Sequence, residues 1–188
     1  MRRIARVSII IGGFLAMAII AAAPRAEDIE VRDVALRSVE EGLALDADFA
    51  FELTPRLADV VGNGVPLYFR VDFELTRRRW YWFDDTAASQ QLQLRLSYHA
   101  LSRQYRLSTG LLQQSFPTLE EALNVLKRVR NWLVVERAVR LADADYDAAV
   151  RMRLDTTLLP KPFQLSALTG RDLQLESAWK RFILRAPR

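Results

Sequence analysis

One stretch with strict alternation of apolar and polar side chains constrains the fold of this chain more than any other feature. It runs from Val65 to Asp85 and reads VPLYFRVDFELTRRRWYWFDD. In its first half every second residue is apolar, namely Leu67, Phe69, Val71, Phe73 and Leu75. A period of two, built from aromatic and aliphatic residues, is typical of a β-strand with one buried face. We therefore expect a central strand here, to which the rest of the chain adds neighbours.

Further alternating segments predict strands before and after this one. They cover residues 29–39, 43–53, 90–98, 103–109, 146–155 and 173–184, the last with Leu173, Leu175 and Trp179 inward. Thr54 followed by Pro55 predicts a short helix, because Thr is a favoured N-cap and Pro fits the first helical turn. Thr118 and Glu121 have capping-box spacing and predict a second helix. The segment after Asn131 fits a strand or a continuation of that helix, and we favour a strand.

These elements predict an all-β, mainly antiparallel fold, because the connections between the strands are short. We expect a β-sandwich-like domain of about eight strands with two short helices, or an open barrel, over residues 27–188. The length of 188 residues suits one domain and a leader. Pro160 and Pro162 predict an extended irregular segment between two strands.

The first 26 residues have the order of a secretory signal: arginines, then an apolar run from Val7 to Ala23, then small residues. The run of 17 residues is also close to the length that spans a bilayer. An uncleaved N-terminal anchor, with membrane attachment through residues 7–23, is therefore the alternative to a signal peptide. With arginines in front, both versions place the remainder outside the cytoplasm. We expect a periplasmic domain, either free or anchored to the inner membrane.

Charge and composition disfavour several classes of function. Four of the 27 Lys and Arg residues lie in the leader, so those that remain balance the 23 Asp and Glu residues. A domain that binds nucleic acid needs a basic excess or a basic stripe, and we therefore expect no nucleic-acid partner. The chain has no cysteine, which excludes disulfides, thiol catalysis and thiolate metal sites.

The second half of the central stretch is the candidate interaction surface. Four aromatic residues follow one another from Trp80 to Phe83, and in a strand successive side chains face opposite sides. Two of them must then be exposed, or covered by another element or by a partner. Trp and Tyr are enriched at interface hot spots. The tentative partner-binding residues are Arg77, Arg78, Arg79, Trp80, Tyr81, Trp82, Asp84 and Asp85. Core packing of the aromatics, with ordinary surface ion pairs around them, is the competing interpretation.

Sites for catalysis or metals are not evident. His99 is the only histidine, and no G-x-S-x-G segment accompanies it, so we expect a structural or capping role for its side chain. Asp143, Asp145 and Asp147 have the spacing that opens a calcium loop. The loop needs a glycine at its sixth position and a glutamate at its twelfth, where this chain has alanine and leucine. We therefore predict no enzyme activity, no cofactor and no metal.

Several blocks in a fixed order resemble a known family. They are GNGVPLYFRVDFEL, RRRWYWFDD, LSYHALSRQYRL, FPTLEEAL, RLDTTLLPKPFQL and LQLESAW. In this order and spacing, over roughly Ile29 to Trp179, they resemble a bacterial family of unknown function, whose members are exported and carry a single domain. Genes of that family often lie beside one for a sensor histidine kinase similar to the nitrogen-regulation kinase NtrY. The resemblance implies a role in envelope signalling, and it supplies no catalytic residues.

The sequence thus favours an exported, non-catalytic interaction module, accessory to an envelope signalling or assembly system. Its expected partner is an envelope protein, with a sensor histidine kinase as the first candidate. The alternative is a periplasmic carrier of a small apolar ligand or lipid held between the sheets. A carrier predicts a large apolar cavity, whereas an interaction module predicts a filled core and an exposed aromatic patch. An envelope hydrolase ranks third, because it needs a cleft that gathers His99 or paired acids.

Overall fold

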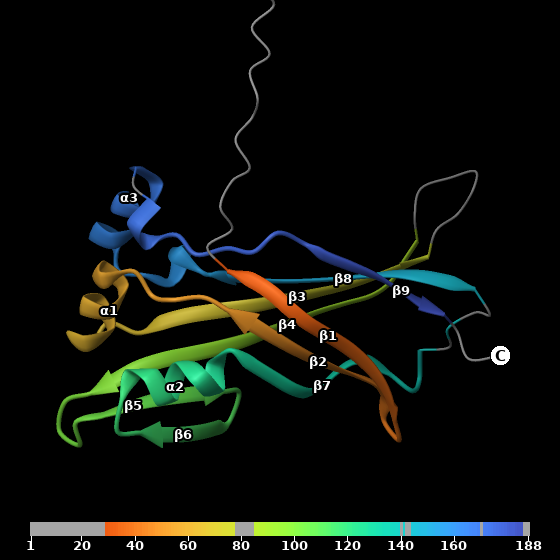
Figure 1. Ribbon diagram of the computed structural model, residues 1–188, viewed down its shortest axis with the longest axis horizontal. Coiled ribbons are helices and arrows are strands. Elements are labelled where there is room, and N and C mark those ends of the chain that lie inside the picture. The colour runs from red at the N-terminus through yellow and green to blue at the C-terminus, as the bar shows by residue number, and fades with distance from the viewer. Residues whose placement is uncertain (1–28, 78–84, 140, 142–143, 170, 186–188) are drawn as a thin grey trace, which may run out of the picture.

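A computed structural model describes residues 29–77, 85–139, 141, 144–169 and 171–185 of the chain (Figure 1). The described residues form nine strands and three α-helices. The strands are β1 (Glu30–Val39), β2 (Gly42–Ala50), β3 (Leu67–Arg77), β4 (Asp85–His99), β5 (Gln104–Thr109), β6 (Leu112–Phe116), β7 (Arg128–Glu136), β8 (Asp145–Leu154) and β9 (Lys180–Arg185). The helices are α1 (Pro55–Gly62), α2 (Leu119–Leu126) and α3 (Lys161–Thr169), with 3-10 turns at Thr156–Leu158 and Arg171–Leu173.

The strands form two sheets of unequal size, and all pairings are antiparallel. One sheet has the order β1-β2-β7 and the other the order β6-β5-β4-β3-β8-β9. In Figure 1 the smaller sheet lies in front of the larger one. Aromatic rings join the two layers: Phe51 stacks on Phe69 with centroids 5.4 Å apart, and Phe73 meets the edge of Trp132 at 6.5 Å. The predicted mainly antiparallel all-β class is confirmed.

The central strand lies where its alternation predicts. β3 pairs with β4 on one side and with β8 on the other. All five of its alternating apolar side chains, from Leu67 to Leu75, have no exposed surface. They face the smaller sheet and form the middle of the core. The intervening residues, from Tyr68 to Thr76, lie on the outer face of the larger sheet, and among them Asp72 is buried as well.

Both predicted helix starts are confirmed by their capping contacts. The Thr54 hydroxyl accepts a hydrogen bond from the N–H of Leu57 at 3.2 Å, and Pro55 occupies the first helical position of α1. The Thr118 hydroxyl accepts from the N–H of Glu121 at 3.2 Å and donates to the Glu121 carboxylate at 3.1 Å. These contacts satisfy N–H groups that have no partner inside a helix. The predicted strand after α2 is also present, but it begins earlier than expected, at Arg128.

Two elements near the C-terminus differ from the sequence prediction. The segment at Pro160 and Pro162 is not extended, because α3 begins at Lys161. Pro162 is the second residue of this helix, where a missing N–H costs nothing. The last strand is shorter than predicted and begins at Lys180, while Leu173 and Leu175 are buried as expected. Trp179 does not point inward; its ring covers the guanidinium of Arg151 at 4.5 Å.

Strand β6 was missed because it carries no burial pattern. Its sequence is LQQSF, and none of its side chains is buried. It pairs with β5 across Gly110, whose φ of +57° suits the tight turn between the two strands. β6 is therefore an edge strand held by backbone pairing, and it extends the larger sheet well beyond the reach of the smaller one.

Candidate functional site

The unequal sizes of the sheets leave an open groove between them. Three strands cannot cover the inner face of six, and α2 packs over only part of the remaining β5 and β6 (Figure 1). A groove of about 380 Å³ remains between β4, β5 and β6 on one side and β7 with the end of α2 on the other. Its apolar lining consists of Leu92, Leu94, Leu107, Leu112, Val125, Leu126, Val129, Trp132 and Leu133. The groove is thus a mainly apolar concave surface.

The groove has a buried floor and an exposed apolar rim. Leu94, Leu107 and Leu126 are buried and belong to the main core. At the rim, the exposed fraction is 76% for Leu112, 39% for Val125 and 36% for Leu133. Apolar side chains that line a concave surface and remain in water are a common mark of a binding site. These residues could not be identified from the sequence, because they come from three separate segments that only the fold brings together.

The charged residues of the groove are all basic. Among the described residues, the charged side chains in its lining are Arg128 and Arg130, with no carboxylate in that lining. The Arg130 guanidinium is already engaged: it pairs with the carboxylate of Asp48 and donates to the Ala47 carbonyl at 3.1 Å. No ion pair to Arg128 occurs within the described residues, and its side chain is exposed. One end of the groove therefore carries a positive charge that a ligand can use.

A bulge in β7 shapes the same end of the groove. Asn131 has a φ of +50°, and the register of β7 with β2 shifts between Leu45 and Ala47. The Asn131 N–H donates to the Asp46 carboxylate at 2.8 Å, which fixes the bulge from the neighbouring strand. A bulge bends its strand and redirects the side chains that follow. Here it is followed by Trp132, whose ring reaches Phe73 in the core while also lining the groove.

The hydrogen bond from the Asn131 N–H lowers the pKa of Asp46, and Arg37, at 2.7 Å, lowers it further. A pKa below its ordinary value of 3.8 means that the ionised carboxylate stabilises the fold above that pH. This stabilisation disappears as the pH falls below 3.8 toward the pKa of the folded state.

The Asp46→Asn variant should therefore be less stable than the wild type at neutral pH, by about 1 kcal/mol, because its amide accepts hydrogen bonds more weakly. Thermal unfolding between pH 7 and 2 measures the effect, and the gap in Tm should close at the acid end. Asn131→Gly keeps the N–H and tolerates a positive φ, so it should retain the wild-type pH dependence. A gap of equal size at both ends of the pH range would contradict the assignment.

One edge of β7 lies next to the groove. β7 pairs with β2 on one side, and the described residues include no strand paired to its other side. The residues of β7 that line the groove, Arg128 to Leu133, belong to this edge strand. Backbone N–H and C=O groups along such an edge can pair with another extended chain. The groove thus combines apolar side chains with an unpaired strand edge.

A cluster of charges occupies the outer face of the larger sheet, away from the groove. Its centre is Asp72, which is 5% exposed. One carboxylate oxygen of Asp72, Oδ2, accepts from Nε of Arg151 at 3.0 Å and from Nε of Arg153 at 3.1 Å. The other oxygen, Oδ1, lies 3.5 Å from Nε of Arg70, a charge contact without hydrogen-bond geometry.

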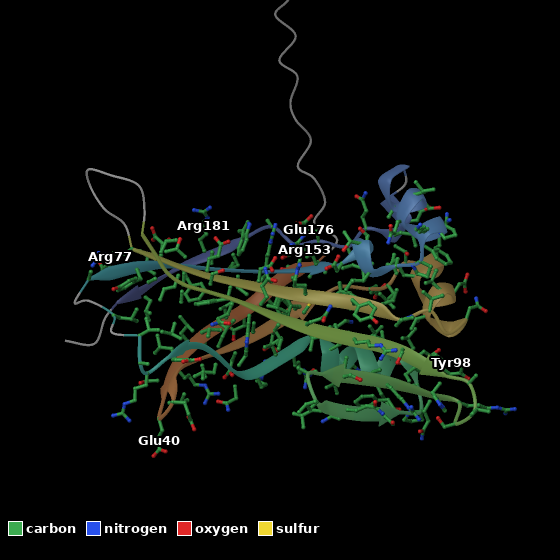
Figure 2. The ribbon with its side chains drawn as sticks, turned by 180° about the vertical axis from the view of Figure 1, so that it is seen from behind. Glu40, Arg77, Tyr98, Arg153, Glu176 and Arg181 are labelled. Atoms are coloured by element: carbon green, nitrogen blue, oxygen red, sulfur yellow. The ribbon has the colours of Figure 1, made fainter. Side chains whose placement is uncertain are left out.

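Two further carboxylates balance this cluster. Asp155 lies 3.6 Å from the Arg70 guanidinium, and Glu176 lies 3.0 Å from that of Arg151. Three arginines thus face three carboxylates, and the cluster is formally neutral. Figure 2 shows Arg153 and Glu176 side by side on this face, where their backbones form a bridge. The contacts join β3, β8 and the segment before β9, so we assign the cluster a structural role.

The predicted interaction surface falls mostly outside the described residues. Arg77 is the last residue of β3 and lies opposite Asp85, the first residue of β4, in the strand ladder. The two ends of the predicted set are therefore neighbours in the sheet. Residues 78–84, which include Arg78, Arg79, Trp80, Tyr81, Trp82 and Asp84, lie outside the part of the chain that the structure describes. Partner binding by this set stays a prediction.

His99 closes a turn, as expected for a capping residue. Its Nδ1 lies 3.0 Å from the Ser102 hydroxyl and accepts from the Ser102 N–H at 3.3 Å. Both contacts fix the connection between β4 and β5. Of the three spaced aspartates, Asp145 and Asp147 belong to β8, and Asp143 lies outside the described residues. The described residues contain no group of three His, Asp or Glu side chains arranged to hold a metal ion.

A second, polar cleft of about 900 Å³ adjoins the apolar groove and shares Arg128 and Arg130 with it. Charges of both signs line it, from β1, β2 and the start of β7. Lys127 lies across its floor, with the ammonium 5.3 Å from the centre of the Phe51 ring. Because its charges are mixed and largely matched, this cleft defines no ligand class.

The fold and the groove define a mainly β, two-sheet domain with an incompletely covered inner face. The chain belongs to the DUF4390 family, a domain of unknown function, whose family model matches residues 26–183. This match confirms the predicted membership of a family of unknown function and covers β1 to β8 and most of β9. Comparison with curated proteins and with solved structures gives no match. Among the described residues, no helix has the length and apolarity to cross a membrane.

Proposed function

We propose that this protein is an exported, non-catalytic interaction module that binds an envelope protein in the groove between its sheets. The observation that carries the proposal is the exposed apolar rim of Leu112, Val125 and Leu133 beside an unpaired strand edge. Exposed apolar side chains that gather on one concave surface often mark a protein-interaction site. The arginine-led apolar leader supports export, as a signal peptide or as an inner-membrane anchor. A sensor histidine kinase remains the first candidate partner.

The shape of the groove favours a protein partner over a small apolar ligand. A carrier encloses most of its ligand, commonly 70–90% of the ligand surface. Here the volume of about 380 Å³ is at the small end for such sites, and the rim is open to water. The space between the sheets beneath β3 is filled by side chains with no exposed surface, such as Phe69 and Phe73. We therefore retain the periplasmic carrier of a lipid or small apolar ligand only as the alternative outcome of the tests.

Substitutions at the rim test this proposal. Leu112→Glu places a charge in the groove, and we expect at least a tenfold loss of the partner protein that co-purifies with the tagged protein from cell envelopes. Leu112 is 76% exposed, so the Tm should change by no more than about 2 °C.

Leu111→Glu is the matched control. Leu111 is the neighbouring residue, is fully exposed and does not line the groove. This variant carries the same change in charge, so partner recovery and Tm should both equal those of the wild type. Equal recovery with Leu111→Glu and Leu112→Glu would contradict the assignment of the groove.

A further inference from the structure

We propose that the groove binds an extended segment of its partner, which pairs with the free edge of β7 as a fourth strand of the smaller sheet. This inference rests on the proposed function and specifies how binding occurs. It would complete the sandwich, since a fourth strand beside β7 would lie over the part of β4, β5 and β6 that three strands leave open. The occupant is a peptide segment in β conformation, with apolar side chains at every second position.

The free edge of β7 and the apolar groove match in position. The residues of β7 that line the groove run from Arg128 to Leu133, so the free edge and the apolar surface coincide along this stretch. Side chains of an added strand would alternate between solvent and the floor. The inward side chains would meet Leu94 and Leu107 on the larger sheet, with Leu112 and Val125 closing over them. Backbone pairing would supply affinity, and the apolar floor would select the side chains.

The positive charge of the groove favours an acidic partner segment. The charged side chains of the groove lining are Arg128 and Arg130, and Arg130 is already paired with Asp48. Arg128 is the first residue of β7, close to the end of α2, and its side chain is exposed. A segment that carries an Asp or Glu at this end would place a carboxylate beside Arg128. We therefore expect an alternating apolar segment with an acidic residue at one or both ends.

The bulge and the arginines of β7 limit which segments can pair with its free edge. An unprotected strand edge pairs with itself or with other chains, and proteins often protect such edges with bulges and charged side chains. β7 carries a bulge at Asn131 and arginines on both sides of Val129, all within the groove segment. On this proposal, these features restrict pairing to a segment whose register and charge fit them. A matched partner segment is thus favoured over a second copy of the chain.

A peptide experiment on the full-length protein tests the inference. The probe is the tightest binder selected from nine-residue peptides in which apolar and polar residues alternate between acidic ends. Its bound form should protect β7 amides from hydrogen exchange. Backbone N-methylation at alternate peptide residues should weaken binding at least 30-fold, because those N–H groups pair with β7. Methylation at the intervening residues should change the Kd less than threefold. Leu112→Glu should weaken peptide binding at least tenfold, and Leu111→Glu should leave it unchanged.

Four results would overturn strand addition: no selected binder, equal sensitivity to N-methylation at all peptide residues, protection at β6 instead of β7, or a dimer of the free protein that Leu112→Glu dissociates. Displacement of a fluorescent fatty acid from the protein tests the carrier alternative. If the fatty acid occupies the groove and no peptide competes with it, the carrier alternative replaces both proposals. If the peptide fails but a cellular protein is still recovered in a Leu112-dependent manner, strand addition is wrong and the proposed function stands.

Discussion

Replacing Asp72 by Asn should lower the free energy of unfolding by about 3 kcal/mol, because three arginines would lose the one buried carboxylate between them. Removal of one member of a buried ion pair commonly costs about 3–5 kcal/mol. The arginines at this site have side chains 24–30% exposed, so we place the loss at the lower end of that range. The amide oxygen can still accept hydrogen bonds from Arg151 and Arg153, but the neutral amide cannot balance their charges. Urea unfolding at neutral pH measures the difference.

The control for Asp72→Asn lies on the same face of the same strand. Glu74 is two residues further along β3 and is exposed. Glu74→Gln removes the same charge without uncovering a buried group, and its effect should stay within about 0.5 kcal/mol. A loss below about 1 kcal/mol for Asp72→Asn would show that water already solvates the arginine cluster, and the structural role assigned to it would then be wrong.

Replacing Gly42 by Ala should destabilise the fold by about 3 kcal/mol or more, for a different reason. Gly42 has a φ of +146°, a conformation that other residues rarely adopt. A Cβ at this position would also overlap the carbonyl oxygen of Val135, a backbone atom of β7 that cannot move without breaking the β2–β7 pairing. Thermal or urea unfolding measures the loss.

Gly62→Ala is the comparison for Gly42→Ala. Gly62 ends α1, and a Cβ there would meet no atom within 4 Å. The substitution should be neutral, or stabilising by about 0.5 kcal/mol, because alanine loses less backbone freedom on folding. If Gly42→Ala were no more destabilising than Gly62→Ala, the close approach of β2 and β7 would be incorrect.

Side-chain periodicity was sufficient to predict the fold class. The alternation from Leu67 to Leu75 identified the central strand because that strand separates core from solvent along its whole length. The helix starts were predictable because a cap depends on neighbouring residues, as at Thr54 and Thr118. β6 and α3 were not. β6 is held by backbone pairing without a buried face, and Pro162 is compatible with a helix once it lies in the first turn.

The candidate groove could not be predicted, because it depends on the order of strands in space. Leu112, Val125 and Leu133 belong to β6, α2 and β7, and only the unequal size of the two sheets brings them to one open surface. The burial of Asp72 could not be predicted for a similar reason. In the sequence it is one polar residue of an alternating strand, whereas its burial comes from Arg151 and Arg153 of β8.

The sequence pattern indicated a different surface for partner binding. The aromatic residues from Trp80 to Phe83 attracted attention because consecutive aromatics cannot share one face of a strand. They lie outside the described residues, so their role as partner-binding residues stays a separate prediction from the groove. The groove is formed mainly by common aliphatic residues, and their local sequence pattern does not indicate a binding surface.

The central claim is that the groove binds an envelope protein, and photocrosslinking in intact cells tests it most directly. A photoreactive residue replaces Leu112 at the rim in one strain and Leu111 outside the groove in another. After irradiation, mass spectrometry identifies the adducts. We expect one abundant protein adduct from the Leu112 position that is absent from the Leu111 position. Lipid adducts from the Leu112 position, or the same protein adducts from both positions, would contradict it.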